Sequence, residues 1–415
     1  AKEDVMDFQE VKRTEEMEKF RKEVASWLKQ NVPEEMKTPV EAEDRSEERY
    51  HFWREKNKEL GAKGWLYPTF PKQYGGGGLS GEHLAVLQEE FEDYKAPYAH
   101  RPSYLAGVLL VWGTEEQRQK FLVPLVKGET VGFIKYTEPH SGSDLSSYQS
   151  TAVKDGDTWV LNGSNAFPGG HEDETSAVYF GPMLTDKEAP RHRNLGFFII
   201  PYPTPGLTFK RMQLVHGEGQ CFIYLDDVRV PADHLVGGDH QGWQVMGTAL
   251  EQEHGGQGPS FHRDEPIDNI LSYMQQHLKA RKSPGGDPVL QQIAIEAYIE
   301  SHVDTLFAMR VRSMYHARME MQWEGPMGFL YNRMHGIRNV GRIRDVMGMD
   351  TLVGPHDPLA PQGGAQEAYQ RSSFILQHGA GSLNISKVVL ARRIGISRTR
   401  EQAAPTPATA TSFSV

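Results

Sequence analysis

Apolar residues recur every three or four positions near the start of the chain. Met17, Phe20, Val24 and Trp27 follow this spacing, which is typical of the buried face of an amphipathic helix. The pattern predicts a helix over residues 14–32. Similar patterns predict further helices over residues 48–60, 80–95, 102–111 and 114–125. The first 130 residues are therefore expected to be mostly helical.

The pattern changes from Gly132, where apolar residues gather in short runs of β type. Clusters of Gly, Pro and Asp separate these runs, which favours strands joined by turns. The runs cover residues 133–136, 150–153, 159–161, 177–180, 197–200, 207–209 and 222–225. Asp155-Gly156-Asp157 is typical of a hairpin turn between two of them. A small all-β domain is predicted here.

Helical spacing returns at Trp243 and continues, with breaks, to about Ile396. The stretches 281–288 and 353–364 are predicted loops, and the tail is low in charge and in large apolar residues, which favours disorder. We therefore expect an α+β chain in four parts. These are an N-terminal helical domain over residues 1–130, a central β sandwich or barrel over 131–239, a C-terminal helical domain over 240–400 and a disordered tail over 401–415.

Composition narrows the class of protein. Lys and Arg number 45 against 55 Asp and Glu, a net charge of −10, and no basic stripe is present, so nucleic acid is a poor partner. No apolar run approaches the roughly 20 residues that span a bilayer, so we expect no membrane segment. The single cysteine, Cys221, excludes internal disulfides and Cys-based metal sites and favours a buried filler in a cytoplasmic protein. No spacing of His and carboxylate residues predicts a metal site.

Residues 137–144 form the most informative run, Thr-Glu-Pro-His-Ser-Gly-Ser-Asp. Pro139 fixes one dihedral angle, Gly142 permits an unusual one, and the Ser and Asp side chains can bond nearby amides. The exposed amides and hydroxyls of such a loop suit a flat polar heterocycle or a phosphate, although most loops of this composition only reverse the chain. Two further segments follow it, Asn162-Gly163-Ser164 and a strand end over residues 226–231, Asp-Asp-Val-Arg-Val-Pro.

In this order the three segments resemble the flavin-contacting TEPxxGSD loop, the NG-containing hairpin and the DDVRVP strand end of the acyl-CoA dehydrogenase family. The resemblance extends from about Glu15 to Arg398. It implies an N-terminal helical bundle, a central small β-barrel or sandwich and a C-terminal four-helix bundle. It also implies FAD as cofactor, an acyl-CoA as substrate and an electron-transfer flavoprotein as acceptor. A homodimer, a homotetramer or a mixed tetramer with a related subunit is expected.

Desaturating an acyl thioester between Cα and Cβ needs a base for the α-proton, and burial of a carboxylate raises its pKa towards neutrality. Glu253 is the candidate, because it shares a helix face with apolar residues three to eight positions before it. Those residues are Val245, Met246, Ala249 and Leu250. Glu251 is expected on the opposite, solvated face. The alternative for Glu253 is an ion pair with a cation inside a helical bundle.

The resemblance favours the first reading. In one branch of the family the base occupies an L-x-x-E-R site, which residues 250–254 match with His254 in place of Arg. The other family position for the base is a Y-E-G-T turn. The corresponding stretch here is Gly379-Ala380-Gly381-Ser382, where Ala380 replaces the Glu. Glu253 is therefore the only carboxylate at either family position.

The same resemblance assigns the binding residues. Tyr136 and Thr137 would offer backbone and hydroxyl groups to the isoalloxazine ring, although Tyr136 also fits a core position at the end of a strand. Ser143 matches a serine that contacts the phosphate-bearing part of a ligand. Gly381 and Ser382 lie in the turn beside the cofactor, and His378 is a candidate contact to substrate or cofactor.

Several of these positions depart from the family pattern. Phe167 replaces the usual Trp, Gly169 stands where Thr or Ser bonds the flavin N5 region, and Asn165 replaces a Lys. The R-x-x-F-G segment that reaches a neighbouring subunit's FAD is not recognisable in residues 258–268. Three explanations remain open. The pocket is altered, with His171 or His378 supplying lost bonds; a related subunit completes it; or the chain has lost FAD and become a companion subunit or an enzyme with altered chemistry. A separate possibility keeps the scaffold and FAD but runs different flavin chemistry, such as that of an oxidase. The predicted loops at 281–288 and 353–364 resemble those of members acting on bulky acyl groups, including steroid side chains, without fixing the substrate.

Overall fold

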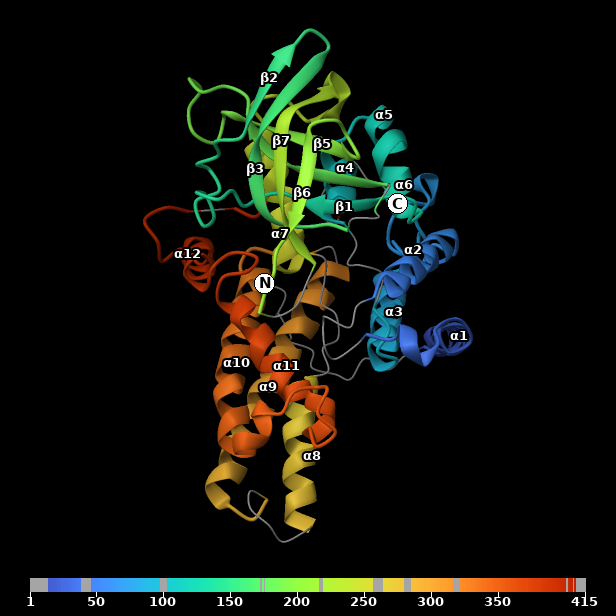
Figure 1. Cartoon of the computed structure of the whole chain (residues 1–415), viewed down its shortest axis with the longest axis vertical. Coiled ribbons are helices and arrows are strands. Elements are labelled where there is room, and N and C mark those ends of the chain that lie inside the picture. The colour runs from blue at the N-terminus through green and yellow to red at the C-terminus, as the bar shows by residue number, and fades with distance from the viewer. Residues whose placement is uncertain are drawn as a thin grey trace, which may run out of the picture.

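A computed structural model gives the fold of the chain. It describes residues 14–38, 46–97, 103–171, 174, 176–215, 219–256, 264–279, 285–316, 319, 321–400, 402–405 and 407. Its elements follow the predicted α–β–α order. The sheet lies at one end of the molecule, the long C-terminal helices at the other, and the N-terminal helices pack alongside (Figure 1).

The N-terminal part is helical, and each predicted helix is present. The helices are α1 (Glu15–Asn31), α2 (Glu47–Ala62), α3 (Gly81–Asp93), α4 (Tyr104–Trp112), α5 (Glu115–Gln117) and α6 (Val123–Val126), with short turns η1 (Glu34–Met36) and η3 (Lys72–Tyr74). The Thr14 hydroxyl caps α1 by accepting from the Met17 amide at 3.2 Å. The helix predicted over residues 114–125 is interrupted by a π turn, η4 (Arg118–Leu122).

A single core joins these helices to the sheet. Helix α4 is apolar on all sides, and residues 105–110 are buried, as expected for a helix enclosed by other elements. It packs against α7 (Gly242–Glu251) and β1 (Val131–Ile134). Side chains of the N-terminal helices such as Trp27 and Phe91 belong to the same buried cluster as Phe180 and Phe197 of the sheet.

The central part is one mixed sheet. Its other strands are β2 (Thr151–Asp155), β3 (Thr158–Gly169), β4 (Ala177–Leu184), β5 (Leu195–Tyr202), β6 (Leu207–Arg211), β7 (Gln220–Pro231) and β8 (Leu235–Val236). In the described residues the strand order is β6-β7-β3-β2-β4-β5-β8, with β1 beside β4 in parallel. The predicted turn between β2 and β3 is confirmed, because β2 ends at Asp155 and β3 begins at Thr158.

The expectation of a hairpin at Asn162-Gly163-Ser164 is wrong. These residues lie inside β3, at a register shift between Leu161 and Gly163. Gly163 has φ +149°, and a Cβ there would stand 2.0 Å from Ser150 Oγ, so the close crossing of β2 needs glycine. The Asn162 amide group exchanges two 2.9 Å hydrogen bonds with Asp227 of the DDVRVP segment. Two of the three motif segments thus hold each other.

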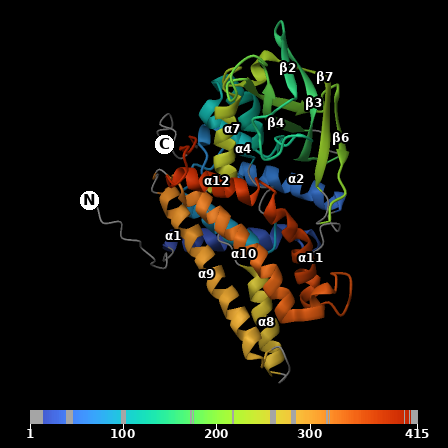
Figure 2. The ribbon, with the colours of Figure 1, turned by 90° about the vertical axis from the view of Figure 1, so that its left-hand side faces the viewer.

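The C-terminal part begins with α7 and the π turn η6 (Gln252–Gly256). The remaining elements are α8 (Glu265–Lys279), α9 (Pro288–His316), α10 (Glu324–Met347), η7 (Gly348–Leu352), η8 (Pro361–Gly364), α11 (Ala365–Ser372), η9 (Ser373–Gln377) and α12 (Leu383–Arg393). Helices α8, α9 and α10 share a second buried cluster. Figure 2 shows α12 lying between the sheet and the upper ends of α9 and α10.

Some predicted features fall outside the described residues. They include the first half of the loop at 281–288, the stretch 257–263 within the missing R-x-x-F-G segment, and most of the tail from residue 401. The loop at 353–364 is described and is tied to α8. Gln362 Nε2 of the loop donates to the Asn269 carbonyl at 2.6 Å, and Tyr273 of α8 donates to Asp350 Oδ2 of η7, just before the loop, at 2.6 Å.

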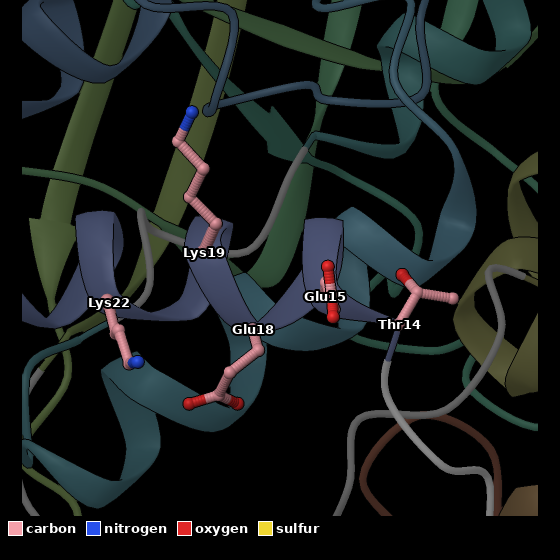
Figure 3. A pocket seen from close by; sticks show the side chains of 5 residues that line it. All are labelled: Thr14, Glu15, Glu18, Lys19 and Lys22. Atoms are coloured by element: carbon pink, nitrogen blue, oxygen red, sulfur yellow. The ribbon is translucent and has the colours of Figure 1, made fainter.

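A surface pocket lies on the first turns of α1. It has a volume of about 440 Å³ and is lined by Thr14, Glu15, Glu18, Lys19 and Lys22. Figure 3 shows its charged side chains projecting from one helix. The pocket includes none of the residues that the sequence assigns to catalysis or cofactor binding.

Candidate active site

Glu253 lies where α7 passes into the π turn η6. Val245, Met246 and Ala249 of α7 are fully buried, so the apolar face predicted for this helix is confirmed. The Glu253 side chain is half-buried. Single π turns inside helices occur often at functional sites, because they shift a side chain from its regular α-helical direction.

Glu253 has a phenol and a guanidinium as electrostatic neighbours. Burial, and secondarily the charges of Glu253 and Tyr104, raise the pKa of Tyr136 well above its usual value. Burial lowers the pKa of Arg333, and Glu253 opposes this shift. The charge of Glu253 therefore acts on both the strand end at Tyr136 and Arg333 of α10, the helix that packs against η6. The cation required by the ion-pair alternative for Glu253 is present as Arg333.

Arg333 holds the turn that replaces the second family position for the base. Its guanidinium is 4% exposed and donates to the carbonyls of Gly381 at 2.6 Å, Ile375 at 3.0 Å and Gly379. It also lies over the Phe329 ring, 4.9 Å from its centroid. Sequence reasoning missed Arg333, because nothing in its spacing on α10 indicates a turn about 45 residues away.

The same turn contacts η6. His254 Nε2 lies 3.0 Å from the Ala380 carbonyl and donates to it in the tautomer protonated at Nε2. Ala380 and Gly381 both have left-handed backbones, with φ of +48° and +87°. The π turn that carries Glu253 and the turn that contains position 380 are thus in contact through His254. Ser382 caps α12 by accepting from the Ile385 amide at 3.3 Å, and His378 is exposed just before the turn.

The loop at 137–144 is rigidly held. Buried Glu138 accepts from the amides of Gln149 and Ser150, both at 2.8 Å. The Thr137 carbonyl accepts from the Ala166 amide at 2.8 Å. Ser143 is exposed at the tip of the loop.

Tyr136 presents an unusual polar atom. The side chain is 7% exposed, and its hydroxyl has no hydrogen-bond partner among the described residues. A buried phenol without a partner costs about 1–3 kcal/mol. The reading of Tyr136 as a core residue at the end of a strand accounts for its burial but not for this hydroxyl.

Phe167 and Gly169 lie at a second register shift in β3. Phe167 has φ +71° and its side chain is 49% exposed, so a large apolar ring is held towards solvent by a strained backbone. A Cβ at Gly169 would stand 2.7 Å from the Phe133 ring. The space for the missing Thr or Ser hydroxyl is therefore filled by Phe133.

Two other expectations are refined by the contacts. His171 stacks on Tyr50 of α2 with ring centroids 3.7 Å apart. The prediction that Glu251 is solvated is wrong. Glu251 forms an ion pair with Arg393 of α12, and the two side chains are 15% and 5% exposed. The prediction failed because α12, distant in sequence, covers this face of α7.

Cys221 is free and buried, and burial raises the pKa of its thiol to about 11.

Comparisons with known proteins agree with this geometry. The N-terminal domain of acyl-CoA dehydrogenases matches residues 14–129, and the middle domain matches residues 134–228. Acyl-CoA dehydrogenase IpdE1 of Mycobacterium tuberculosis is 30% identical over 295 residues, which cover 68% of this chain and 74% of the relative. The chain belongs to the acyl-CoA dehydrogenase family. Members of this family are FAD-dependent oxidoreductases that act on CH–CH groups.

Solved structures show the same fold over nearly the whole length. A steroid acyl-CoA dehydrogenase, Tcur3481-Tcur3483, has a TM-score of 0.77 at 24% identity and covers 95% of this chain and 100% of its own. The ChsE4-ChsE5 complex from Mycobacterium tuberculosis has a TM-score of 0.78 at 23% identity, with the same coverage. The predicted fold class is confirmed. Among the described helices, none is long and apolar enough to cross a membrane.

Proposed function

We propose that this protein is an FAD-dependent acyl-CoA dehydrogenase that desaturates an acyl-CoA between Cα and Cβ, with Glu253 as the base. The observation that carries the proposal is the place of Glu253, an electrostatic neighbour of Tyr136 on a π turn whose next residue, His254, contacts the Ala380 carbonyl. A carboxylate beside the strand end assigned to the cofactor is the arrangement that proton removal next to an electron acceptor requires.

Three observations support a bound FAD. The Phe167 ring is exposed on a strained backbone, as expected of an aromatic side chain that packs against a flat ligand. The Tyr136 hydroxyl is buried with no partner among the described residues. The Gly379–Gly381 turn, which the resemblance places beside the cofactor, is held in one position, because its three carbonyls bond Arg333 and His254. The cofactor-binding residues we propose are Tyr136, Thr137, Ser143, Phe167, Gly169, Gly381 and Ser382.

When bound, FAD supplies the acceptor for the electron pair that leaves Cβ. The chain itself supplies the proton acceptor, Glu253, on a turn that α7 anchors in the core. Arg333 fixes the Gly381 and Gly379 carbonyls, so the turn keeps one position relative to Glu253. Ser143 and His378 are proposed to contact the acyl-CoA, because both are exposed near these elements.

A bulky acyl group is the substrate class that we favour. The support is the likeness to a structure described as a steroid acyl-CoA dehydrogenase, together with the small Ala380, whose carbonyl contacts His254, the residue after Glu253. An alanine at this position leaves room that a glutamate side chain would fill. An electron-transfer flavoprotein as acceptor and a cytoplasmic location remain proposals that rest on the family and on the lone cysteine.

Helix α9 carries the feature that supports an oligomer. Ile295, Ile299 and Leu306 are 52%, 56% and 41% exposed, and their spacing of four and seven residues puts them on one stripe of the helix. An exposed apolar stripe of this kind is expected to be covered by a partner. Either a second copy or a second kind of subunit, as in the ChsE4-ChsE5 complex, fits the stripe.

One observation favours a second candidate, a companion subunit with an incomplete flavin site. Phe133 fills the space at Gly169 where the family places a hydroxyl. The retained Glu253 argues against it. The two candidates predict different behaviour of the protein purified alone.

The test is the visible spectrum of the chain purified alone, before and after incubation with FAD. The proposed function predicts the absorption bands of oxidised flavin, bleached without oxygen by a suitable acyl-CoA. A protein that stays colourless after incubation with FAD contradicts it. Colour that requires co-expression with a related subunit supports the companion subunit. Rapid oxygen uptake on re-aeration identifies an oxidase instead.

A further inference from the structure

The buried cluster beneath the Tyr136–Thr137 strand end contains a lysine to which no role has been assigned. Lys135 is 0% exposed, and so is Asn165 beside it. Lys135 Nζ lies 3.2 Å from the Pro182 carbonyl and 3.5 Å from Asn165 Oδ1. Gly181 makes room for it, because a Cβ there would stand 3.0 Å from Lys135 Cγ.

Asn165 links this amine to the proposed cofactor edge. Its Nδ2 donates to the Thr137 carbonyl at 3.3 Å, while its Oδ1 faces Lys135 Nζ. A single orientation of the amide satisfies both contacts, since the ammonium only donates and the carbonyl only accepts. The ammonium polarises the amide and strengthens its bond to Thr137.

The charge of Lys135 is not explained by its contacts. Both acceptors are neutral, and a neutral donor would satisfy them. The buried carboxylate of Glu138 raises the pKa of Lys135, but its two oxygens accept hydrogen bonds from the amides of Gln149 and Ser150. Burial is the larger effect and lowers the pKa of Lys135 to about 8. A buried cation of this kind is poor support for stability, so folding alone does not account for a lysine at this position.

We infer that Lys135 is a positioning and electrostatic residue for the cofactor: through Asn165 it fixes the Thr137 strand end, and its positive charge favours the reduced form of FAD. This inference rests on the proposed function. Reduction adds negative charge at the pyrimidine side of the flavin ring, and charge placed near that edge is a recognised means of tuning the cofactor. The cation lies behind the strand and needs no direct contact with the ring.

The test removes the positive charge at position 135 and then returns it at position 165. Lys135→Met removes it, and Lys135→Met/Asn165→Lys returns an amine from the adjacent strand. Lys154→Met, at an exposed position on β2, is the control. Each protein is loaded with FAD, and the dissociation constant of FAD, the midpoint potential of the bound flavin and the thermal midpoint of the apoprotein are measured.

The expected result has two parts. In Lys135→Met, reduced FAD loses about tenfold more affinity than oxidised FAD, which corresponds to a potential about 30 mV more negative for a two-electron couple. The double variant regains most of the parent potential, and Lys154→Met matches the parent. Should Lys135→Met fail to fold, Lys135→Gln keeps a neutral donor and gives the same comparison.

Two outcomes overturn the inference. One is an unchanged potential in the folded, flavin-loaded Lys135→Met or Lys135→Gln. The other is a folded double variant whose potential stays at that of the single variant, which would make the effect one of shape rather than charge. A parent protein that binds no FAD refutes the proposed function, and the inference with it, before any variant is compared.

Discussion

Replacing Arg333 should loosen the turn opposite Glu253. The guanidinium is buried and donates to the carbonyls of Gly381, Ile375 and Gly379. Hydrogen bonds to charged groups contribute about 1.5–3 kcal/mol each, so three of them set an upper limit of about 5–9 kcal/mol. Truncating one partner of a buried charged cluster costs about 3–5 kcal/mol. We expect Arg333→Met to destabilise the C-terminal part by this smaller amount.

The assay is the thermal midpoint, read together with the rate of flavin reduction by an acyl-CoA. Arg333→Met should lower the midpoint by several degrees and slow flavin reduction by at least tenfold, because a displacement of about 1 Å near a reacting group can cost a hundredfold in rate. Arg333→Lys keeps the charge but loses the planar fork, so it should recover only part of both.

Arg344→Met is the matched control, because Arg344 lies exposed on the same helix. It should leave both the midpoint and the rate unchanged. An Arg333→Met protein that melts within a degree of the parent would refute the reasoning. The three carbonyls would then be satisfied by other donors, and the turn would not depend on α10.

Three other predictions follow from single contacts. Gly163→Ala should lower the free energy of unfolding by about 2–4 kcal/mol in chemical denaturation, because a Cβ would overlap Ser150. Gly142→Ala is the control and should change little, because a Cβ there has nothing within 4 Å. Equal effects of the two variants would contradict the claim that the register shift at residue 163 needs glycine. Gly169→Ser should lower the thermal midpoint of the parent but not that of a Phe133→Ala variant, in which the ring 2.7 Å from the added Cβ is gone. A Gly169→Ser protein that melts like the parent would contradict the steric conflict with Phe133. Hydrogen bonds from Arg342, and secondarily from Arg338 and His335, lower the pKa of Glu300 from an ordinary value of 4.5 to about 2. The ionised carboxylate therefore stabilises the folded protein fully above pH 4.5 and progressively less towards pH 2. The stability of parent and Glu300→Gln should therefore converge over that range in acid titrations, and a constant difference would contradict the assignment.

Local patterns predicted most elements of this fold. The spacing of apolar residues located the helices, and the turn residues at Gly156 located the first hairpin, because these signals depend on neighbours in sequence. The same signals failed at Asn162-Gly163, where a glycine typical of a turn instead permits a close crossing of β2. They also failed at Glu251, since the solvent exposure of one helix face depends on whether α12 covers it.

The candidate site was predictable only in part. Motif likeness picked out Glu253 and the loop at 137–144, because these residues carry chemistry in a fixed order. Arg333 and Lys135 were missed, since each acts through carbonyl groups that become neighbours only in the folded chain. The filling of the space at Gly169 by Phe133 was likewise invisible, because the two residues are 36 positions apart and share no pattern.

The central claim is that Glu253 removes the α-proton. Its most direct test is a single-turnover measurement of flavin reduction by an acyl-CoA in the absence of oxygen, comparing the parent, Glu253→Gln and Glu253→Gln/Ala380→Glu. Because His254 Nε2 lies 3.0 Å from the Ala380 carbonyl, the second variant returns a carboxylate to the same small region. We predict that Glu253→Gln binds FAD normally but reduces it at least a thousandfold more slowly, and that the double variant recovers part of the rate. A Glu253→Gln protein that reduces its flavin at the parent rate would contradict the claim.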